Sequence, residues 1–324
     1  MKVKRYLKNS MKWRGILSGC VLACLLLAIP FPAHAAGNKG VRQEVHFKSG
    51  ACRLFGYYFP PIKNPNGKGI VLCPGSNDKG CSNILFLEIC KRFARLGYTC
   101  LLFDFRGYGR SEVPEKISSF EDLNYTRDAI SAVSYLKKMA PHLKEIDIVG
   151  HSMGGGVAVS AGVRDQRISK IISISPGRRV TELFLRKNAK LGLKWIQQRI
   201  YQDTNKRVLI PLSLIKDVTL PISIDTYRKF IFLKPILFLE GTYEDPKDIA
   251  YLTQYVKDIK DMREKTHIIL PTNHWIGTAN GTKVVFSIAI HILVVTIDAW
   301  IRSDEPALKD ILRRVKRSRM VPVQ

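Results

Sequence analysis

The sequence predicts an α/β protein built on a mostly parallel, eight-stranded, doubly wound sheet with a helical lid insertion. About eight short segments are apolar or alternate apolar and polar residues, as strands do, and from the third onward helical stretches separate them. An interval of about sixty residues, 177–234, breaks this alternation with basic, helix-like patterns. An insertion of that length, placed beyond the strand ends, is typical of a lid over a ligand crevice.

The expected elements follow in order along the chain. The strands are Gln43–Phe47, Cys52–Phe59, Gly69–Cys73, Thr99–Asp104, Glu145–Val149, Ile168–Ile174, Pro235–Glu240 and Thr266–Leu270. The helices are Asn83–Leu96, Leu123–Met139, Ser152–Val163, Asp248–Ile259 and Val284–Ile301. The first two strands form a hairpin around Ser49-Gly50. The last helix carries only Asp298 as a formal charge, so we expect it to pack beside the sheet.

The first 35 residues have the order of a secretory signal. Six basic residues precede an apolar run from Ile16 to Ile29, and Ala33-His34-Ala35 is a small-residue cleavage pattern. We therefore expect cleavage after Ala35 and export, so that the mature protein is periplasmic or secreted. An uncleaved segment that anchors the protein in a membrane is the alternative.

The net charge of the chain and the composition of residues 303–324 indicate which kinds of partner the protein could bind. The formal net charge is +25, and +19 remains without residues 1–35, which favours anionic partners. A domain over 36–302 is followed by a tail, 303–324, with apolar residues on one helical face amid lysine and arginine. This basic amphipathic pattern is typical of a helix on an anionic membrane surface, and a solvated tail is the alternative. Export and the absence of phosphate-loop or zinc-finger motifs argue against nucleic acid.

The cysteine pattern indicates neither a metal site nor a cofactor. Five of the seven cysteines follow residue 35, and none forms a C-x-x-C motif or a His/Cys cluster at metal spacing. Outside the cytosol these five thiols allow one or two disulfides and leave at least one thiol unpaired. No pairing is predicted.

The strongest local signal is a serine between a strand and a helix. Ser152 lies in Gly150-His151-Ser152-Met153-Gly154, where the flanking glycines Gly150 and Gly154 let the backbone turn sharply. Such a turn raises the serine hydroxyl above the sheet edge. A serine that merely caps the following helix is the alternative. The context predicts Ser152 as a nucleophile.

A serine nucleophile needs a general base and a carboxylate, which follow it in that structural context in the order acid, then histidine. His274 lies four residues beyond the last expected strand and is the predicted base. The acid is Glu244 or Asp245, which follow the strand ending at Glu240. Counting from that strand favours Glu244, and counting back from the next helix favours Asp245, to which we give a slight preference.

Acyl transfer also needs donors for a developing oxyanion. One is the main-chain N–H of Met153, directly after the nucleophile. The second comes from the loop after the third strand, where Ser76 is the expected donor and Asn77 the alternate. Gly75 permits close approach of this loop to the site.

Together, these motifs resemble the α/β-hydrolase superfamily across about residues 45–300. The run Asp104-Phe-Arg-Gly-Tyr-Gly-Arg-Ser111 looks like the branch that contains Bem46-like hydrolases and the serine aminopeptidase type. The resemblance implies the α/β-hydrolase fold and a structural role beside the site for Asp104, Arg106 and Gly109. Two departures leave rate and substrate open: Pro74-Gly75 replaces the usual His-Gly, and the acid turn is one residue longer.

The sequence thus predicts an exported serine hydrolase that cleaves a small-molecule or lipid ester, or a thioester, through an acyl-Ser152 intermediate. The first alternative is a peptidase of the same fold, which needs an acidic pocket for a free amino terminus. The second is a catalytically silent scaffold that binds a membrane or an acidic polymer through its basic lid and tail.

Overall fold

The computed structural model describes residues 42–77, 79–114, 123–176, 234–258, 264–277 and 283–317. The strands are β1 (Gln43–Ser49), β2 (Cys52–Phe59), β3 (Lys68–Cys73), β4 (Thr99–Phe103), β5 (Glu145–His151), β6 (Ile168–Ile174), β7 (Ile236–Gly241) and β8 (Lys265–Leu270). The helices are η1 (Gly80–Ser82), α2 (Ile84–Arg95), α3 (Tyr125–Met139), α4 (Met153–Gly162), α7 (Pro246–Asp258), α8 (Lys283–Ile301) and α9 (Glu305–Arg317). The expected signal segment 1–35 and the expected lid 177–234, except for Lys234, lie outside the described residues.

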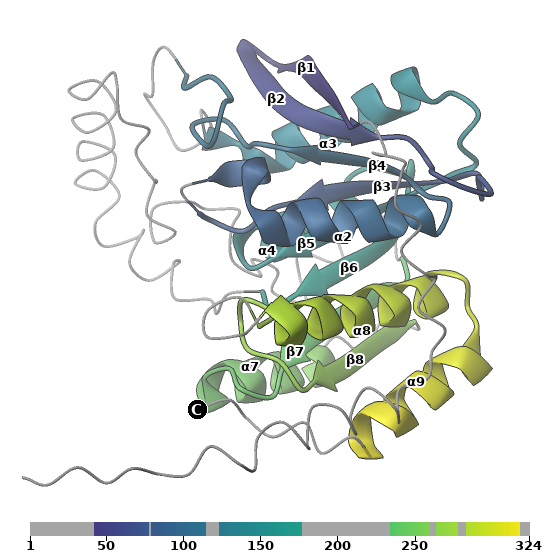
Figure 1. Cartoon of the computed structure of the whole chain (residues 1–324). Coiled ribbons are helices and arrows are strands. Elements are labelled where there is room, and N and C mark those ends of the chain that lie inside the picture. The colour runs from purple at the N-terminus through teal and green to yellow at the C-terminus, as the bar shows by residue number, and fades with distance from the viewer. Residues whose placement is uncertain are drawn as a thin grey trace, which may run out of the picture.

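The eight strands form one sheet in the order β1-β2-β4-β3-β5-β6-β7-β8 (Figure 1). The hairpin of β1 and β2 is antiparallel, and β2 pairs antiparallel with β4. All pairings from β4 through β8 are parallel. The predicted eight-stranded, mostly parallel sheet is therefore confirmed.

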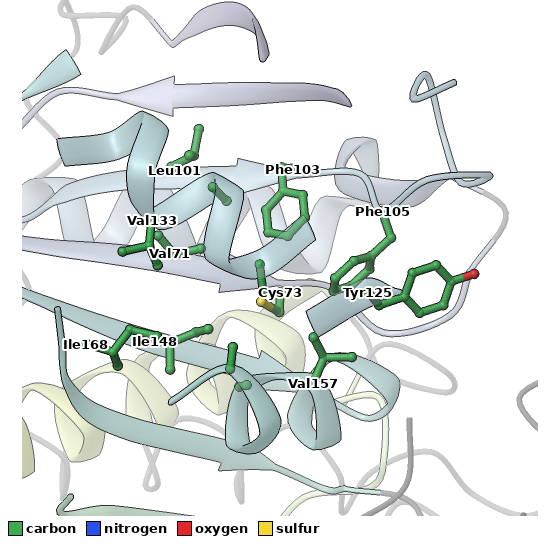
Figure 2. Packing of buried hydrophobic residues seen from close by; sticks show 14 of the residues in the cluster. Val71, Cys73, Leu101, Phe103, Phe105, Tyr125, Val133, Ile148, Val157 and Ile168 are labelled. Carbon is green, nitrogen blue, oxygen red and sulfur yellow. The ribbon is translucent and has the colours of Figure 1, made fainter. Parts of the chain in front are cut away.

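Helices cover both faces of the sheet. Neighbouring residues of β3 pack against different helices. Val71 belongs to the core cluster that contains residues of α3, α4 and α7. Ile70 and Leu72 instead pack with α2 and α8 on the opposite face. Side chains alternate along a strand, so a strand covered on both faces carries apolar residues on both. Figure 2 shows one of these layers, where Val133 of α3 and Val157 of α4 meet the strands.

The basic helix at the end of the chain, α9, packs on the body of the protein. Leu308, Leu312 and Val315 contact the core cluster beneath α8, and α9 lies beside α8 (Figure 1). The apolar stripe that favoured a membrane surface is thus directed at the protein. The charged residues of α9 pair in part with one another, as Arg313 and Arg314 do with Asp310.

The described part of the chain has no helix that meets the length and hydropathy of a membrane span. All five described cysteines are buried and none is in a disulfide; they are Cys52, Cys73, Cys81, Cys90 and Cys100. Burial raises the pKa of the Cys73 and Cys81 thiols. These side chains therefore act as small apolar groups of the core.

Candidate active site

A strained turn joins β5 to α4 at the expected nucleophile. Ser152 has a φ of 52° and a ψ of −118°, a backbone conformation that is unfavourable for a residue with a Cβ. The glycines on either side are required by close backbone contacts. A Cβ on Gly150 would lie 1.9 Å from the main-chain oxygen of Gly154, and one on Gly154 would lie 2.1 Å from that of Cys73. The two glycines of the G-x-S-x-G motif are thus required by this turn.

The hydroxyl of Ser152 is directed at an imidazole and does not cap the helix. Its side chain makes no capping hydrogen bond to α4, although Ser152 precedes the first residue of that helix. Instead, Ser152 Oγ lies 3.0 Å from Nε2 of His274. Ser152 itself is only 8% exposed.

His274 joins Ser152 to a buried carboxylate. It follows β8 by four residues, and its Nδ1 lies 3.2 Å from Oε2 of Glu244. Glu244 has a side chain that is 5% exposed, and its Oε1 accepts hydrogen bonds from Ser175 Oγ and from the N–H of Gly241. Burial opposes ionisation of Glu244, but the hydrogen bonds from His274, Ser175 and Gly241 outweigh it, so its pKa is lowered.

The tautomer of His274 follows from this geometry. An ionised carboxylate only accepts hydrogen bonds, so Nδ1 of His274 carries the hydrogen that faces Glu244. Nε2 is then an acceptor for the Ser152 hydroxyl. The arrangement can remove a proton from Ser152 while the carboxylate of Glu244 stabilises the resulting imidazolium.

The slight preference for Asp245 as the acid is corrected by the structure. Glu244 contacts His274, whereas Oδ1 of Asp245 accepts a 2.8 Å hydrogen bond from the N–H of Lys247 in the first turn of α7. The reason is the length of the turn. β7 ends at Gly241, and Glu244 closes back on that residue through its own N–H and its carboxylate.

The loop after β3 lies against Ser152. A Cβ on Gly75 would lie 3.1 Å from Cβ of Ser152, so only a glycine allows the loop to approach this closely. Asn77 Nδ2 donates a 2.9 Å hydrogen bond to the Gly75 oxygen, and its Oδ1 accepts from Lys79, so this side chain braces the loop. Ser76 follows Gly75, and its Oγ lies 3.4 Å from the hydroxyl of Tyr108.

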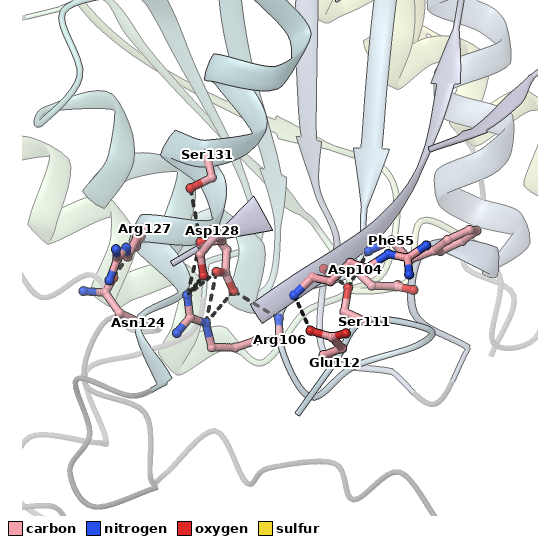
Figure 3. Close-up of polar contacts among 11 residues, drawn as sticks. Phe55, Asp104, Arg106, Ser111, Glu112, Asn124, Arg127, Asp128 and Ser131 are labelled. Atoms are coloured by element: carbon pink, nitrogen blue, oxygen red, sulfur yellow. Dashed lines mark hydrogen bonds and ion pairs between the residues drawn. The ribbon is translucent and has the colours of Figure 1, made fainter. Parts of the chain in front are cut away.

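The neighbouring loop after β4 is fixed by two buried carboxylates. Asp104 accepts hydrogen bonds from the N–H groups of Cys81 and Arg110, and a Cβ on Gly109 would clash with it. Arg106 pairs with Asp128 of α3, with Nη2 2.6 Å from Oδ1 (Figure 3). Because the Arg106 and Asp128 side chains are both buried, removing either would leave an uncompensated charge.

Two residues of the site, Ser175 and His151, were not predicted from the sequence. Ser175 follows β6 and bonds to Glu244, and the rule that parallel strand ends meet at one sheet edge could have found it. The motif places His151 only in the turn before Ser152, whereas the structure places its Nε2 2.6 Å from the main-chain oxygen of His274. Met153, directly after Ser152, opens α4, so its N–H belongs to the first turn, where helices leave N–H groups without helical partners.

Comparisons with known proteins agree with this architecture. A family model described as "Serine aminopeptidase, S33" matches residues 65–272. The chain is 28% identical over 138 residues to a polyketide transferase, grgF, of a Penicillium species, covering 42% of this chain and 45% of that protein. It is 27% identical over 139 residues to a thiohydrolase, apmlB, of Arthrinium phaeospermum, covering 42% and 44%.

The chain thus spans less than half the length of these curated relatives. Among solved structures, an esterase from Pyrococcus furiosus superposes with a TM-score of 0.53 at 18% identity, covering 85% of this chain and 91% of that one. At that identity the likeness concerns the fold.

Proposed function

The chain belongs to the serine aminopeptidase S33 family of α/β hydrolases, and from this premise we propose that it cleaves an ester or thioester through an acyl-Ser152 intermediate. The observation that carries the proposal is the run of contacts from Ser152 through His274 to Glu244, at 3.0 Å and 3.2 Å. A hydroxyl is a weak nucleophile at neutral pH, and this arrangement supplies the base that it needs.

The proposed reaction has two halves. Ser152 Oγ attacks the carbonyl carbon of the substrate while Nε2 of His274 takes the hydroxyl proton. The tetrahedral oxyanion is held by the N–H groups of Met153 and Ser76. As the intermediate collapses, His274 returns the proton to the leaving alcohol or thiol.

In the second half, His274 takes a proton from a water molecule that attacks the acyl-serine. The second oxyanion collapses, the acid is released and the proton returns to Ser152. Glu244 stays ionised throughout, because the hydrogen bonds that lower its pKa do not depend on the substrate.

Two relatives support an ester or thioester as the substrate class. One is called a thiohydrolase, and the superposed structure is called an esterase.

Export is proposed from the basic, apolar and small-residue order of residues 1–35. Contact with an anionic membrane surface is proposed from the basic residues of α9, with charge rather than an inserted apolar face as its basis.

Labelling with a fluorophosphonate probe tests the proposal. Purified wild type should label covalently, and Ser152→Ala and His274→Ala should not. Labelling that survives in Ser152→Ala, or folded wild type that does not label at all, would contradict the proposal. Turnover of acyl-chain esters, acyl thioesters and aminoacyl amides then separates the ester hydrolase from the peptidase.

Removing the hydrogen bond from Ser175 to Glu244 should lower kcat less than removing Ser152 or His274. Ser175→Ala removes one of the hydrogen bonds that hold the carboxylate, and we expect kcat to fall by about 3- to 10-fold, as for the loss of one hydrogen bond of about 1 kcal/mol. Steady-state kinetics on the best ester measures this. Ser175→Thr keeps the hydroxyl and should stay closer to wild type. Equal kcat values in Ser175→Ala and wild type would exclude the role.

A further inference from the structure

The ring of His151 is enclosed between the nucleophile and the loop of the proposed base. His151 is the last residue of β5 and is 0% exposed. Its ring centroid lies 5.2 Å from that of His274, 5.7 Å from that of Trp275 and 5.8 Å from that of Phe86. Because its side chain is fully buried and packs against three aromatic rings, His151 has little freedom to rotate.

The single N–H of His151 is committed to the backbone of His274. Burial, reinforced by the nearby His274, lowers the pKa of His151 to about 4, so the ring is neutral near pH 7. A neutral imidazole has one N–H. Nε2 lies 2.6 Å from the main-chain oxygen of His274, and a carbonyl oxygen only accepts, so the hydrogen is on Nε2.

The other ring nitrogen lies against the oxyanion loop. Among the described residues, Nδ1 of His151 has no hydrogen-bond partner. A Cβ on Gly75 would lie 2.9 Å from this nitrogen, so the ring and the loop are in direct contact. A buried acceptor without a donor is unfavourable, and an apolar ring would avoid that cost. The bond from Nε2 to His274 accounts for an imidazole at this position.

The hydrogen bond from His151 Nε2 to the main-chain oxygen of His274 matters because it does not change during the proposed reaction. In the proposed mechanism, the contact from His274 to Ser152 is lost when the serine is acylated. Among the described hydrogen bonds of the His274 ring, the one with Glu244 then remains, and the His274 side chain is 38% exposed. The bond from His151 to the main chain of His274 involves neither reacting atom, so it persists through both halves of the reaction.

We propose that His151 is a positioning residue that holds the main chain of His274 and the Gly75 loop at a fixed spacing around Ser152. The inference rests on the proposed function, since it assigns His151 a part in aligning the base with the oxyanion donors. Misplacing such groups by about 1 Å typically costs about 100-fold in rate.

Two variants separate the donor from the ring. His151→Phe keeps a planar ring and removes the donor, and we expect kcat to fall by about 10- to 100-fold while KM changes less than about 2-fold. His151→Gln carries an amide N–H that reaches about as far as Nε2, and it should recover kcat to within about 5-fold of wild type. A kcat for His151→Phe within about 2-fold of wild type, or equal losses in both variants, would overturn the proposal. Thermal unfolding of each variant shows that it is folded.

A measurement on the unmodified protein avoids any folding defect. Two-bond ¹H–¹⁵N NMR correlation identifies the tautomer of each histidine, with His151→Gln used to assign the signal. We expect a neutral ring with hydrogen on Nε2 from pH 5.5 to 8. An Nδ1–H tautomer, or a ring that is charged at pH 5.5, would overturn the inference. Because NMR needs no substrate, its result stands apart from the labelling of Ser152, which tests the proposed function.

Discussion

Replacing Glu244 by alanine is expected to lower kcat for ester hydrolysis by roughly 10,000-fold, the loss seen when the carboxylate of a serine triad is disabled. Without Glu244, nothing in the described contacts holds the hydrogen on Nδ1 of His274, and the imidazolium loses its counter-charge. The Ser152 hydroxyl then meets a ring that can present the wrong nitrogen. KM should change little, because the carboxylate lies behind the base.

The neighbouring carboxylate provides a matched control. Asp245→Ala should keep kcat within about 3-fold and lose about 1 kcal/mol of stability, because its hydrogen bond to Lys247 N–H caps α7. Steady-state kinetics and denaturant unfolding on both variants decide between the residues. A large loss of kcat in Asp245→Ala with an active Glu244→Ala would assign the acid to Asp245.

Replacing Asp147 by asparagine is expected to remove a strongly pH-dependent contribution to stability. Asp147 is 0% exposed in β5, and among described residues neither carboxyl oxygen has a hydrogen-bond partner. Burial raises the pKa of Asp147 from 3.8 to about 7. Between these values the folded protein binds a proton that the unfolded chain releases, so this carboxyl lowers stability as pH rises through that window.

The expected size follows from the pKa difference. At about 1.4 kcal/mol per pKa unit, the free energy of unfolding loses up to about 4 kcal/mol between pH 4 and pH 7 because of this group. The stability of Asp147→Asn relative to wild type should therefore rise by up to that amount from pH 4.5 to pH 8. Urea unfolding at both pH values measures the change. A pH-independent difference for Asp147→Asn would contradict the prediction.

The sequence predicted the sheet and the places of Ser152 and His274 after β5 and β8 for physical reasons that the structure makes plain. Strands covered on both faces are mostly apolar, so β3, with its run Ile70-Val-Leu-Cys73, was recognisable from the sequence. The elbow at Ser152 requires glycine where a Cβ would meet backbone atoms, and that requirement is visible as a motif. The position of His274 followed from the end of β8 alone.

Other parts of the site could not be predicted, because they depend on contacts between segments that are far apart in the sequence or on the closure of a turn. Glu244 and Asp245 are adjacent carboxylates, and their directions depend on how the turn after Gly241 closes on itself. The roles of Ser175 and His151 depend on contacts across 69 and 123 positions of sequence. No local pattern encodes such pairings, because each arises only when the parallel strands are in register.

The division of the sheet into an antiparallel and a parallel part has a consequence for how the protein tolerates change. Ser152, Ser175, Glu244 and His274 follow β5, β6, β7 and β8, and the Gly75 loop follows β3, which adjoins β5. These five strands form one uninterrupted parallel block, while the β1–β2 hairpin lies at the opposite edge. A disturbance at the hairpin can loosen that edge and leave the distances between the reacting groups intact. A register slip anywhere within the parallel block would displace a reacting group, so mutations in that block should affect turnover before they unfold the protein.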